Sequence, residues 1–164
     1  MSLGHISNTK CKFFIWLITQ NSVWMPDRLQ KEVGRTSPTC PLCRCAPETA
    51  HHLLVDGRYT KRIWNLTAEW TAQPTLRLQE WQSSNSVAQW WSNTTMTPHI
   101  DPHKAMASII VMLIITWKIW KERNSRIFKH HETSATALMS TIKQEARAWV
   151  AAGAKDLAGL VLRE

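Results

Sequence analysis

Residues 40–57 read CPLCRCAPETAHHLLVDG, and this stretch constrains the fold more than any other. Cys40 and Cys43 form a C-x-x-C pair, and His52 follows on a predicted helix. Two thiolates on a tight turn and an imidazole on the next helix suit tetrahedral zinc, which binds sulfur at about 2.3 Å and nitrogen at about 2.0 Å. A Cys at position 57 would complete a C-x2-C…H-x4-C pattern, but Gly57 stands there. The stretch therefore predicts a recognisable metal site that lacks its fourth ligand.

Charge and cysteine content narrow the class of protein. The 164 residues include 20 Lys and Arg against 12 Asp and Glu, which gives a net charge of +8. A basic surface favours nucleic acid or an anionic membrane as partner, without choosing between them. Cys40, Cys43 and Cys45 lie so close together that metal binding in a reducing compartment suits them better than separate disulfides. No secretory signal is visible, so we expect an intracellular protein of the nucleus or cytoplasm.

The longest uncharged run that is mainly apolar covers residues 105–117. It is shorter than the stretch of about 20 apolar residues that a membrane-spanning helix needs. We therefore predict a buried helix here and no membrane partner.

The hydrophobic pattern predicts a mainly α protein, because no strand-like alternation is found. The Asp101-Pro102 pair is a strong helix start, with Asp as the cap and Pro in the first turn. The ten Trp residues are expected mainly in the core. Helices are predicted over residues 10–20, 26–33, 59–72, 87–91, 101–129 and 134–157. We divide the chain into a small helical zinc-binding module (8–72), a connector (73–100) and a C-terminal tail of two long amphipathic helices (101–160).

Several motifs, taken in order, resemble a known family. KFFIWLITQ, W-M-P-D-R-L, CPLC, ETAHHLL and RIW follow one another within residues 10–66. This order is similar to the zinc-binding domain that follows the reverse transcriptase of plant LINE-type (non-LTR) retrotransposons. WKIWKERNSRIF and EARAWVAAGAK look like the helical tail found after this domain in many plant members.

The resemblance implies that Cys40, Cys43 and His52 match three zinc ligands of the family, and that the fourth family Cys falls on Gly57. Asp56 could replace it through a carboxylate oxygen. Cys45 or a water molecule could also fill the position, although Cys45 is very close in sequence to Cys43. Two outcomes stay open: the chain retains zinc, or the site has decayed and its side chains only pack.

We expect no catalytic residues in this chain. Two-metal phosphoryl transfer needs clustered carboxylates around metal ions about 3.5–4 Å apart. The chain has no adjacent acidic pair, and its Asp residues are scattered at Asp27, Asp56, Asp101 and Asp156. It also lacks a Gly-rich phosphate loop. These absences argue against a polymerase, RNase H or endonuclease centre.

A basic arc on the predicted helix over residues 101–129 is the first candidate for contacts with nucleic-acid phosphates. It consists of Lys118, Lys121, Arg123, Arg126 and Lys129. A second basic surface surrounds the zinc stretch and is formed by Lys10, Lys12, Arg28, Lys31, Arg35, Arg44, Arg58, Lys61 and Arg62. Such charges grip RNA or DNA backbones without reading bases.

The sequence therefore predicts a non-catalytic zinc-binding module that supports reverse transcription by binding RNA or DNA. Two other functions stay open. The chain could be a structural domain that docks a protein partner or a second copy of itself, or it could be a decayed retroelement fragment.

Overall fold

The structure is a computed structural model that describes residues 9–10, 12–16, 39–96 and 101–162. The helix predicted over residues 26–33 lies outside these ranges. In chain order the elements are a π-helical turn η1 (His52–Asp56), α3 (Arg58–Thr71), the short 3-10 turns η2 (Pro74–Leu76) and η3 (Leu78–Glu80), α4 (Val87–Thr95), α5 (Pro102–Phe128), α6 (Ala135–Ala151) and α7 (Lys155–Val161). The described ranges hold no β-strand, and one isolated bridge pairs Thr39 with Pro47. The predicted mainly α fold is therefore confirmed.

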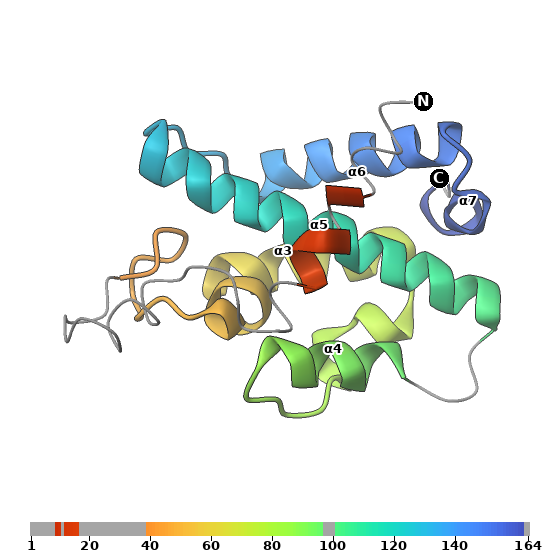
Figure 1. Cartoon of the computed structure of the whole chain (residues 1–164), viewed down its shortest axis with the longest axis horizontal. Helices are drawn as coiled ribbons and strands as arrows, with labels where there is room; N and C mark the ends of the chain where they lie inside the picture. Colours follow the sequence, from red (N-terminus) through yellow and green to blue (C-terminus); the bar gives the residue numbers. More distant parts are fainter. Residues whose placement is uncertain (1–8, 11, 17–38, 97–100, 163–164) are drawn as a thin grey trace.

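Helix α5 is the long central element of the molecule (Figure 1). It begins as predicted, because the Asp101 side chain accepts a hydrogen bond from the His103 N–H and Pro102 occupies the first turn. It contacts η1, α4, α6 and α7, while α3 contacts η1, α6 and α7. One hydrophobic core joins residues from η1, α3, α5, α6 and α7. The metal stretch therefore shares its core with the C-terminal helices, and the predicted boundaries at residues 72 and 100 stay predictions.

Among the described residues, helix α5 is long and apolar enough, by length and composition, to cross a membrane. However, half of its most apolar stretch is buried inside the protein. The central helix of a water-soluble protein passes the same test, so this finding is weak support for a membrane span.

A cluster of Trp side chains fills the space between α3, η3 and α4. Trp64 lies 5.3 Å from Trp81 and 5.5 Å from Trp90 between ring centroids, and Trp81 and Trp90 are also 5.5 Å apart. The Trp64 indole N–H donates to the Leu54 carbonyl at 3.0 Å, and this bond ties α3 to η1. Aromatic contacts of this kind contribute about 0.5–1.5 kcal/mol beyond the burial of area. The cluster therefore holds the metal-bearing turn against α3.

Three helices differ from their predictions. Helix α4 continues to Thr95, beyond the predicted end at residue 91. The helix predicted over 134–157 begins at its Ser134 cap but ends at Ala151, and α7 follows as a separate helix. Gly153 has φ = 116°, far from the helical value, so the helix ends before it. Glycine suits this position because residues with a Cβ atom rarely adopt such a backbone angle. Near the N-terminus, residues 12–16 are helical, with Phe14 and Ile15 buried and Phe13 60% exposed. Residues 9–10 are helical too, whereas residue 11 and residues 17–20 of the helix predicted over 10–20 lie outside the described residues.

Candidate metal centre

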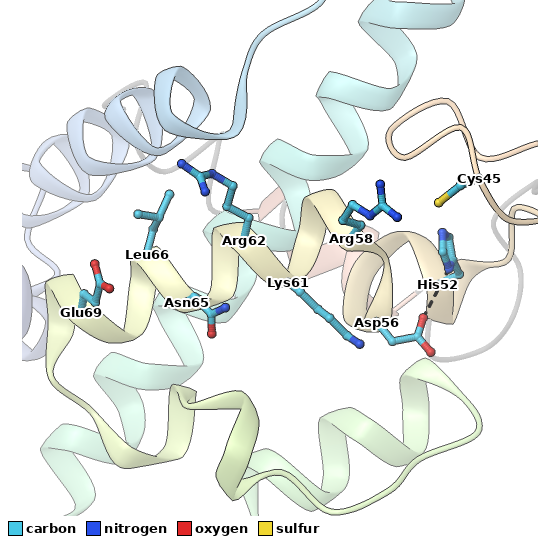
Figure 2. A pocket seen from close by; sticks show the side chains of 9 residues that line it. All are labelled: Cys45, His52, Asp56, Arg58, Lys61, Arg62, Asn65, Leu66 and Glu69. Carbon is cyan, nitrogen blue, oxygen red and sulfur yellow. Dashed lines mark ion pairs between the residues drawn. The ribbon is translucent and has the colours of Figure 1, made fainter.

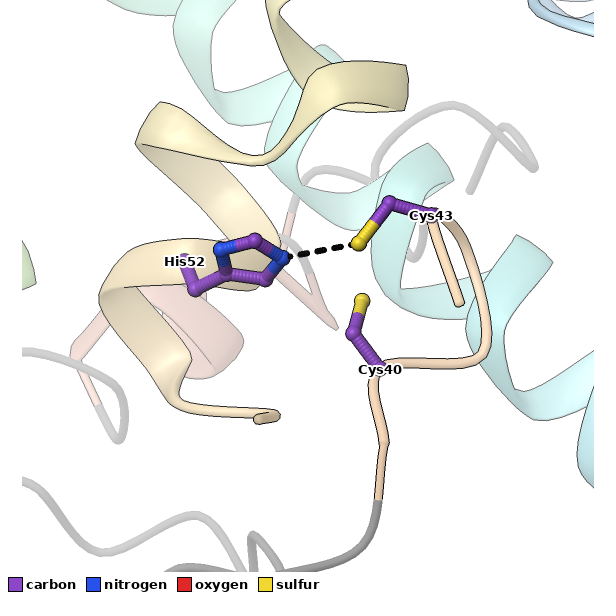
Figure 3. Close-up of side chains that lie close together, drawn as sticks. All are labelled: Cys40, Cys43 and His52. Carbon is purple, nitrogen blue, oxygen red and sulfur yellow. Dashed lines mark hydrogen bonds between the residues drawn. The ribbon is translucent and has the colours of Figure 1, made fainter. Parts of the chain in front are cut away.

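Cys40, Cys43 and His52 come together in space as the spacing predicted (Figure 3). One ligand atom from each of the three lies within 4.8 Å of the others, and Cys43 Sγ is 3.1 Å from His52 Nε2. Two thiolates and one imidazole are a donor set that suits zinc. The residues therefore fit the metal that their pattern predicts.

The C-x-x-C turn is closed by backbone hydrogen bonds. The Cys40 N–H donates to the Ala46 carbonyl at 2.8 Å, and the Arg44 N–H donates to the Cys40 carbonyl at 2.9 Å. Arg44 takes a left-handed conformation with φ = 59°, which turns the chain back on itself. Leu42, between the two cysteines, is buried in the core. These contacts present both sulfur atoms on one side of the turn.

His52 reaches the cluster from the π-helical turn η1. The Thr49 hydroxyl accepts a hydrogen bond from the His52 N–H at 3.0 Å, which caps the start of the turn. The Gly57 N–H donates to the His52 carbonyl at 2.7 Å, which gives the five-residue hydrogen-bond spacing of a π-helix. Sequence periodicity predicted an ordinary helix here, because a single wide turn leaves no pattern in the hydrophobic residues.

Asp56 lies behind the imidazole and not beside the sulfur atoms. Its carboxylate oxygens are 3.5 Å from His52 Nδ1 and 3.4 Å from His51 Nδ1. His52 therefore directs Nε2 to Cys43 and Nδ1 to a carboxylate, which is how metal-binding histidines are commonly oriented. In this structure Asp56 is placed to orient a ligand, whereas the sequence offered it as a fourth ligand.

His51 joins Asp56 to a distant loop, since His51 Nε2 is 2.9 Å from Ser84 Oγ. These contacts follow the order of a Ser-His-Asp hydrolase triad. Asp56 is shared with His52, however, and neither His51 nor Ser84 lines the surface groove that Arg58, Lys61 and Arg62 form along α3. We interpret these contacts as a tie between the loop and η1.

Cys45 lies at the exposed edge of the cluster. A hydrogen bond with the Cys43 thiol raises the pKa of Cys45. The group of ligand atoms found within the described residues nevertheless includes only Cys40, Cys43 and His52.

Gly57 stands where the resemblance implies a fourth Cys ligand, and the structure places this position beside the cluster. A Cβ atom added at Gly57 would lie 3.2 Å from His52 Nε2. It would also lie 2.7 Å from the His52 carbonyl oxygen, so a small backbone shift would have to accompany a larger side chain. The backbone angles are ordinary, with φ = −65° and ψ = 151°. Position 57 therefore aims at the metal site, and Gly supplies no ligand there.

The two cysteines of the turn differ in acidity. Burial raises the pKa of Cys40 to about 11, although the N–H groups of Cys43 and Leu42 hydrogen-bond to its sulfur and oppose the rise. Burial also opposes ionisation of Cys43, but the Cys45 N–H and the His52 side chain outweigh it and lower the pKa of Cys43 to about 7. Metal binding must therefore displace a proton from Cys40 at neutral pH.

The predicted basic arc on α5 does not form one exposed surface. Arg123 pairs with buried Glu48, and Arg126 is held by Glu122 and by backbone carbonyls. The Lys118 ammonium lies 3.7 Å from a Glu145 oxygen, and its side chain is largely covered. Lys121 and Lys129 are exposed. The predicted phosphate contacts thus stay a prediction for these two lysines, whereas Arg123 and Arg126 are turned into the protein.

A basic groove runs from the metal site along α3 (Figure 2). Arg58, Lys61 and Arg62 project from the exposed face of α3 and line it, and Asp56 and Glu69 lie near its ends. Arg58, Lys61 and Arg62 belong to the second basic surface that the sequence indicated. The structure places them on one helical face, because they are three and four residues apart.

Comparison with known proteins supports the identity of the metal-binding segment. The family model described as zinc-binding in reverse transcriptase matches residues 5–64. No curated protein and no solved structure matches the chain. The matched segment contains the whole Cys-Cys-His cluster and position 57. Residues 5–64 of this chain therefore resemble the zinc-binding domain of reverse transcriptase, and Cys40, Cys43 and His52 are the candidate zinc ligands of that domain.

Proposed function

We propose that this chain is a non-catalytic zinc-binding module of plant LINE-type retrotransposon origin that binds RNA or DNA through phosphate contacts. In that role it would hold template or target nucleic acid for a reverse transcriptase. The observation that carries the proposal is the basic face of α3, which begins beside the candidate metal centre. The free thiols of the cluster also suit the reducing interior of a cell.

The α3 face has the charge needed for backbone binding. Arg58, Lys61 and Arg62 are exposed, and among the described residues none of the three belongs to an ion pair. Cations that are already in solvent can bind a phosphate without first breaking an internal contact. Each phosphate that they neutralise releases condensed counterions, which makes binding depend on salt. The metal turn and η1 would hold one end of this helix in place.

A salt titration tests the proposal. Binding of a short fluorescent single-stranded RNA, and of the matching DNA, is measured by anisotropy between about 50 and 200 mM salt. We expect affinity to fall steeply with salt for the wild-type chain. The triple variant Arg58→Gln/Lys61→Gln/Arg62→Gln should bind more weakly and lose about 2 from its log–log salt slope, because each lost contact to a single strand contributes about 0.7.

A control variant separates a local site from net charge. Arg77→Gln/Lys104→Gln/Lys155→Gln removes the same charge from exposed positions elsewhere. Equal loss of binding in both triple variants would assign the effect to net charge and contradict the α3 site. A flat salt response, or no binding at low salt, would contradict nucleic-acid binding altogether.

Exposed aromatic side chains favour a second candidate function, docking of a protein partner or a second copy of the chain. Phe13 and Trp16 stack with ring centroids 6.1 Å apart and are both exposed, and Phe128 at the end of α5 is 73% exposed. Sedimentation with and without RNA distinguishes the two functions, because a stable dimer that ignores RNA supports the second. Gly57 favours a third candidate, in which the chain is a retroelement remnant whose metal site has decayed.

A further inference from the structure

Arg126 extends from the last turns of α5 to the metal-binding turn. Its Nη1 donates hydrogen bonds to the carbonyl oxygens of Pro41 and Leu42, at 3.0 and 3.2 Å. These carbonyls belong to the two residues that separate Cys40 from Cys43. Only 9% of the Arg126 side chain is exposed. A guanidinium from the C-terminal half of the chain therefore lies directly against the C-x-x-C turn.

The other faces of this guanidinium are also held. Nε donates to the Glu122 carboxylate at 2.7 Å, and Nη2 donates to the Thr133 carbonyl at 3.1 Å. The Tyr59 ring lies 4.9 Å below the guanidinium carbon, and its hydroxyl also donates to the Thr133 carbonyl, at 2.8 Å. A planar group bonded at all three nitrogens has one orientation, so the direction of Nη1 toward the turn is fixed.

The two carbonyls that Arg126 contacts belong to peptide units whose N–H groups point to the Cys40 side chain. The Pro41 carbonyl shares a peptide unit with the Leu42 N–H, and the Leu42 carbonyl shares one with the Cys43 N–H. Both of these N–H groups hydrogen-bond to the Cys40 side chain. Linked hydrogen bonds polarise one another in a medium of low dielectric constant. A cation on the carbonyl side therefore makes both N–H groups stronger donors to the sulfur.

We propose that Arg126 is a positioning residue of the metal site, which fixes the C-x-x-C turn and strengthens the amide hydrogen bonds to Cys40. This inference rests on metal binding by Cys40, Cys43 and His52, and it does not depend on nucleic-acid binding. Residues outside the ligand shell that orient metal ligands change metal affinity by about 10- to 100-fold when they are replaced. Arg126 would be such a residue, and it lies on α5, far outside the matched residues 5–64.

The test measures the affinity of folded variants for Co²⁺, whose thiolate charge-transfer absorption reports the ligands directly. Arg126→Gln should weaken Co²⁺ binding by about 10- to 100-fold. Arg126→Lys keeps the charge but cannot serve both carbonyls, Glu122 and Thr133 together, so its affinity should fall between those of Gln and wild type. Lys121→Gln removes an exposed charge from the same helix and should bind like wild type.

The outcomes separate positioning from packing. If Arg126 only packs, Arg126→Gln will lower the unfolding temperature of the metal-free protein and leave the Co²⁺ affinity of the folded protein unchanged, which overturns the inference. Failure of the wild-type chain to bind Co²⁺ would overturn the metal assignment itself. It would leave the α3 phosphate contacts to their own test.

A second measurement needs no variant and covers the case in which Arg126→Gln does not fold. Coupling between two sites is reciprocal, so metal binding must also stabilise the contacts of Arg126. Hydrogen exchange in the wild-type chain should slow on metal addition at Leu42 and Cys43, and equally around Thr133. Helix α7, which packs near the opposite end of α5 from Arg126, is the internal control. Protection limited to the metal turn would overturn the inference.

Discussion

Glu48 and Arg123 form a bidentate buried ion pair, with Nε 2.5 Å from one carboxylate oxygen and Nη2 3.3 Å from the other. Their side chains are 1% and 9% exposed. Glu48 opens the segment that carries His52, and Arg123 lies on α5, 75 residues later in the chain. The pair therefore fixes the metal-bearing segment on the central helix.

Removing one partner of this pair should destabilise the protein strongly. Glu48→Gln or Arg123→Met leaves a buried charge without its partner, which costs about 3–5 kcal/mol of unfolding free energy. Replacing both residues with apolar ones should cost much less than the two single changes together. Chemical denaturation measures all three variants, with exposed Lys121→Gln as a near-neutral control. Additive losses in the double variant would show that the two groups act independently.

Gly57→Cys should restore a full metal site. The new Cβ would lie 3.2 Å from His52 Nε2, so its sulfur can join the other three ligands after a small backbone shift. We expect substoichiometric zinc in the parent chain and nearly one zinc per chain in the variant, measured on protein purified without added metal. Gly159→Cys is the matched control, because nothing lies within 4 Å of its Cβ. Full occupancy in the parent would show that another group already completes the site.

Zinc affinity should rise with pH, and more steeply at low pH. Both thiols must lose their protons to bind metal. Between the pKa of Cys43, about 7, and that of Cys40, about 11, only Cys40 still carries a proton. Zinc affinity should therefore rise by about tenfold per pH unit in this range, where one proton is displaced. Below it, where two protons are displaced, affinity should rise by about 100-fold per pH unit. Chelator competition across pH measures the slope. Cys45→Ser should keep the slope above about pH 7, because Cys45 is not one of the clustered ligands and its contact with Cys43 affects only the lower step. A flat profile would argue against thiolate ligands.

Replacing each of two glycines near the C-terminus with Ala should change the free energy of unfolding in opposite directions. Gly153 has φ = 116°, so Gly153→Ala strains the backbone and should cost more than about 1 kcal/mol. Gly159 lies within α7 with open space around its Cβ, so Gly159→Ala should stabilise the fold by about 0.5–1 kcal/mol. Thermal unfolding of the two variants gives both signs. A stabilising Gly153→Ala would mean that α6 and α7 can form one continuous helix.

Local signals in the sequence were enough to predict the helices with strong caps. Asp101-Pro102 and Ser134 start α5 and α6 as expected, because their side chains or rings act within one turn. The proximity of Cys40, Cys43 and His52 was also predictable, since a turn and the following helix leave few arrangements. The π-helical turn and the interruption between α6 and α7 at Gly153 were not predicted. Each depends on the backbone conformation of a few residues, which leaves no periodic pattern in the sequence.

The basic arc shows why longer-range features could not be read from α5 alone. The sequence grouped Arg123 and Arg126 with three lysines as candidates for phosphate contacts, which need exposed side chains. In the structure Arg123 is buried and only 9% of the Arg126 side chain is exposed. The reason is a set of acceptors from distant parts of the chain, namely the Glu48 carboxylate and the carbonyls of the metal turn. Buried acceptors need donors, and only the folded structure shows where those acceptors lie.

The contact between Arg126 and Pro41 has a consequence for the order of synthesis. The two residues are 85 positions apart. At a translation rate of about 5–20 residues per second, Arg126 is therefore added about 4–17 s after Pro41. For most of this interval the nascent chain carries Cys40, Cys43 and His52, while α5 is absent or incomplete. A product that stopped before α5 would hold every candidate ligand and never receive the arginine that secures them.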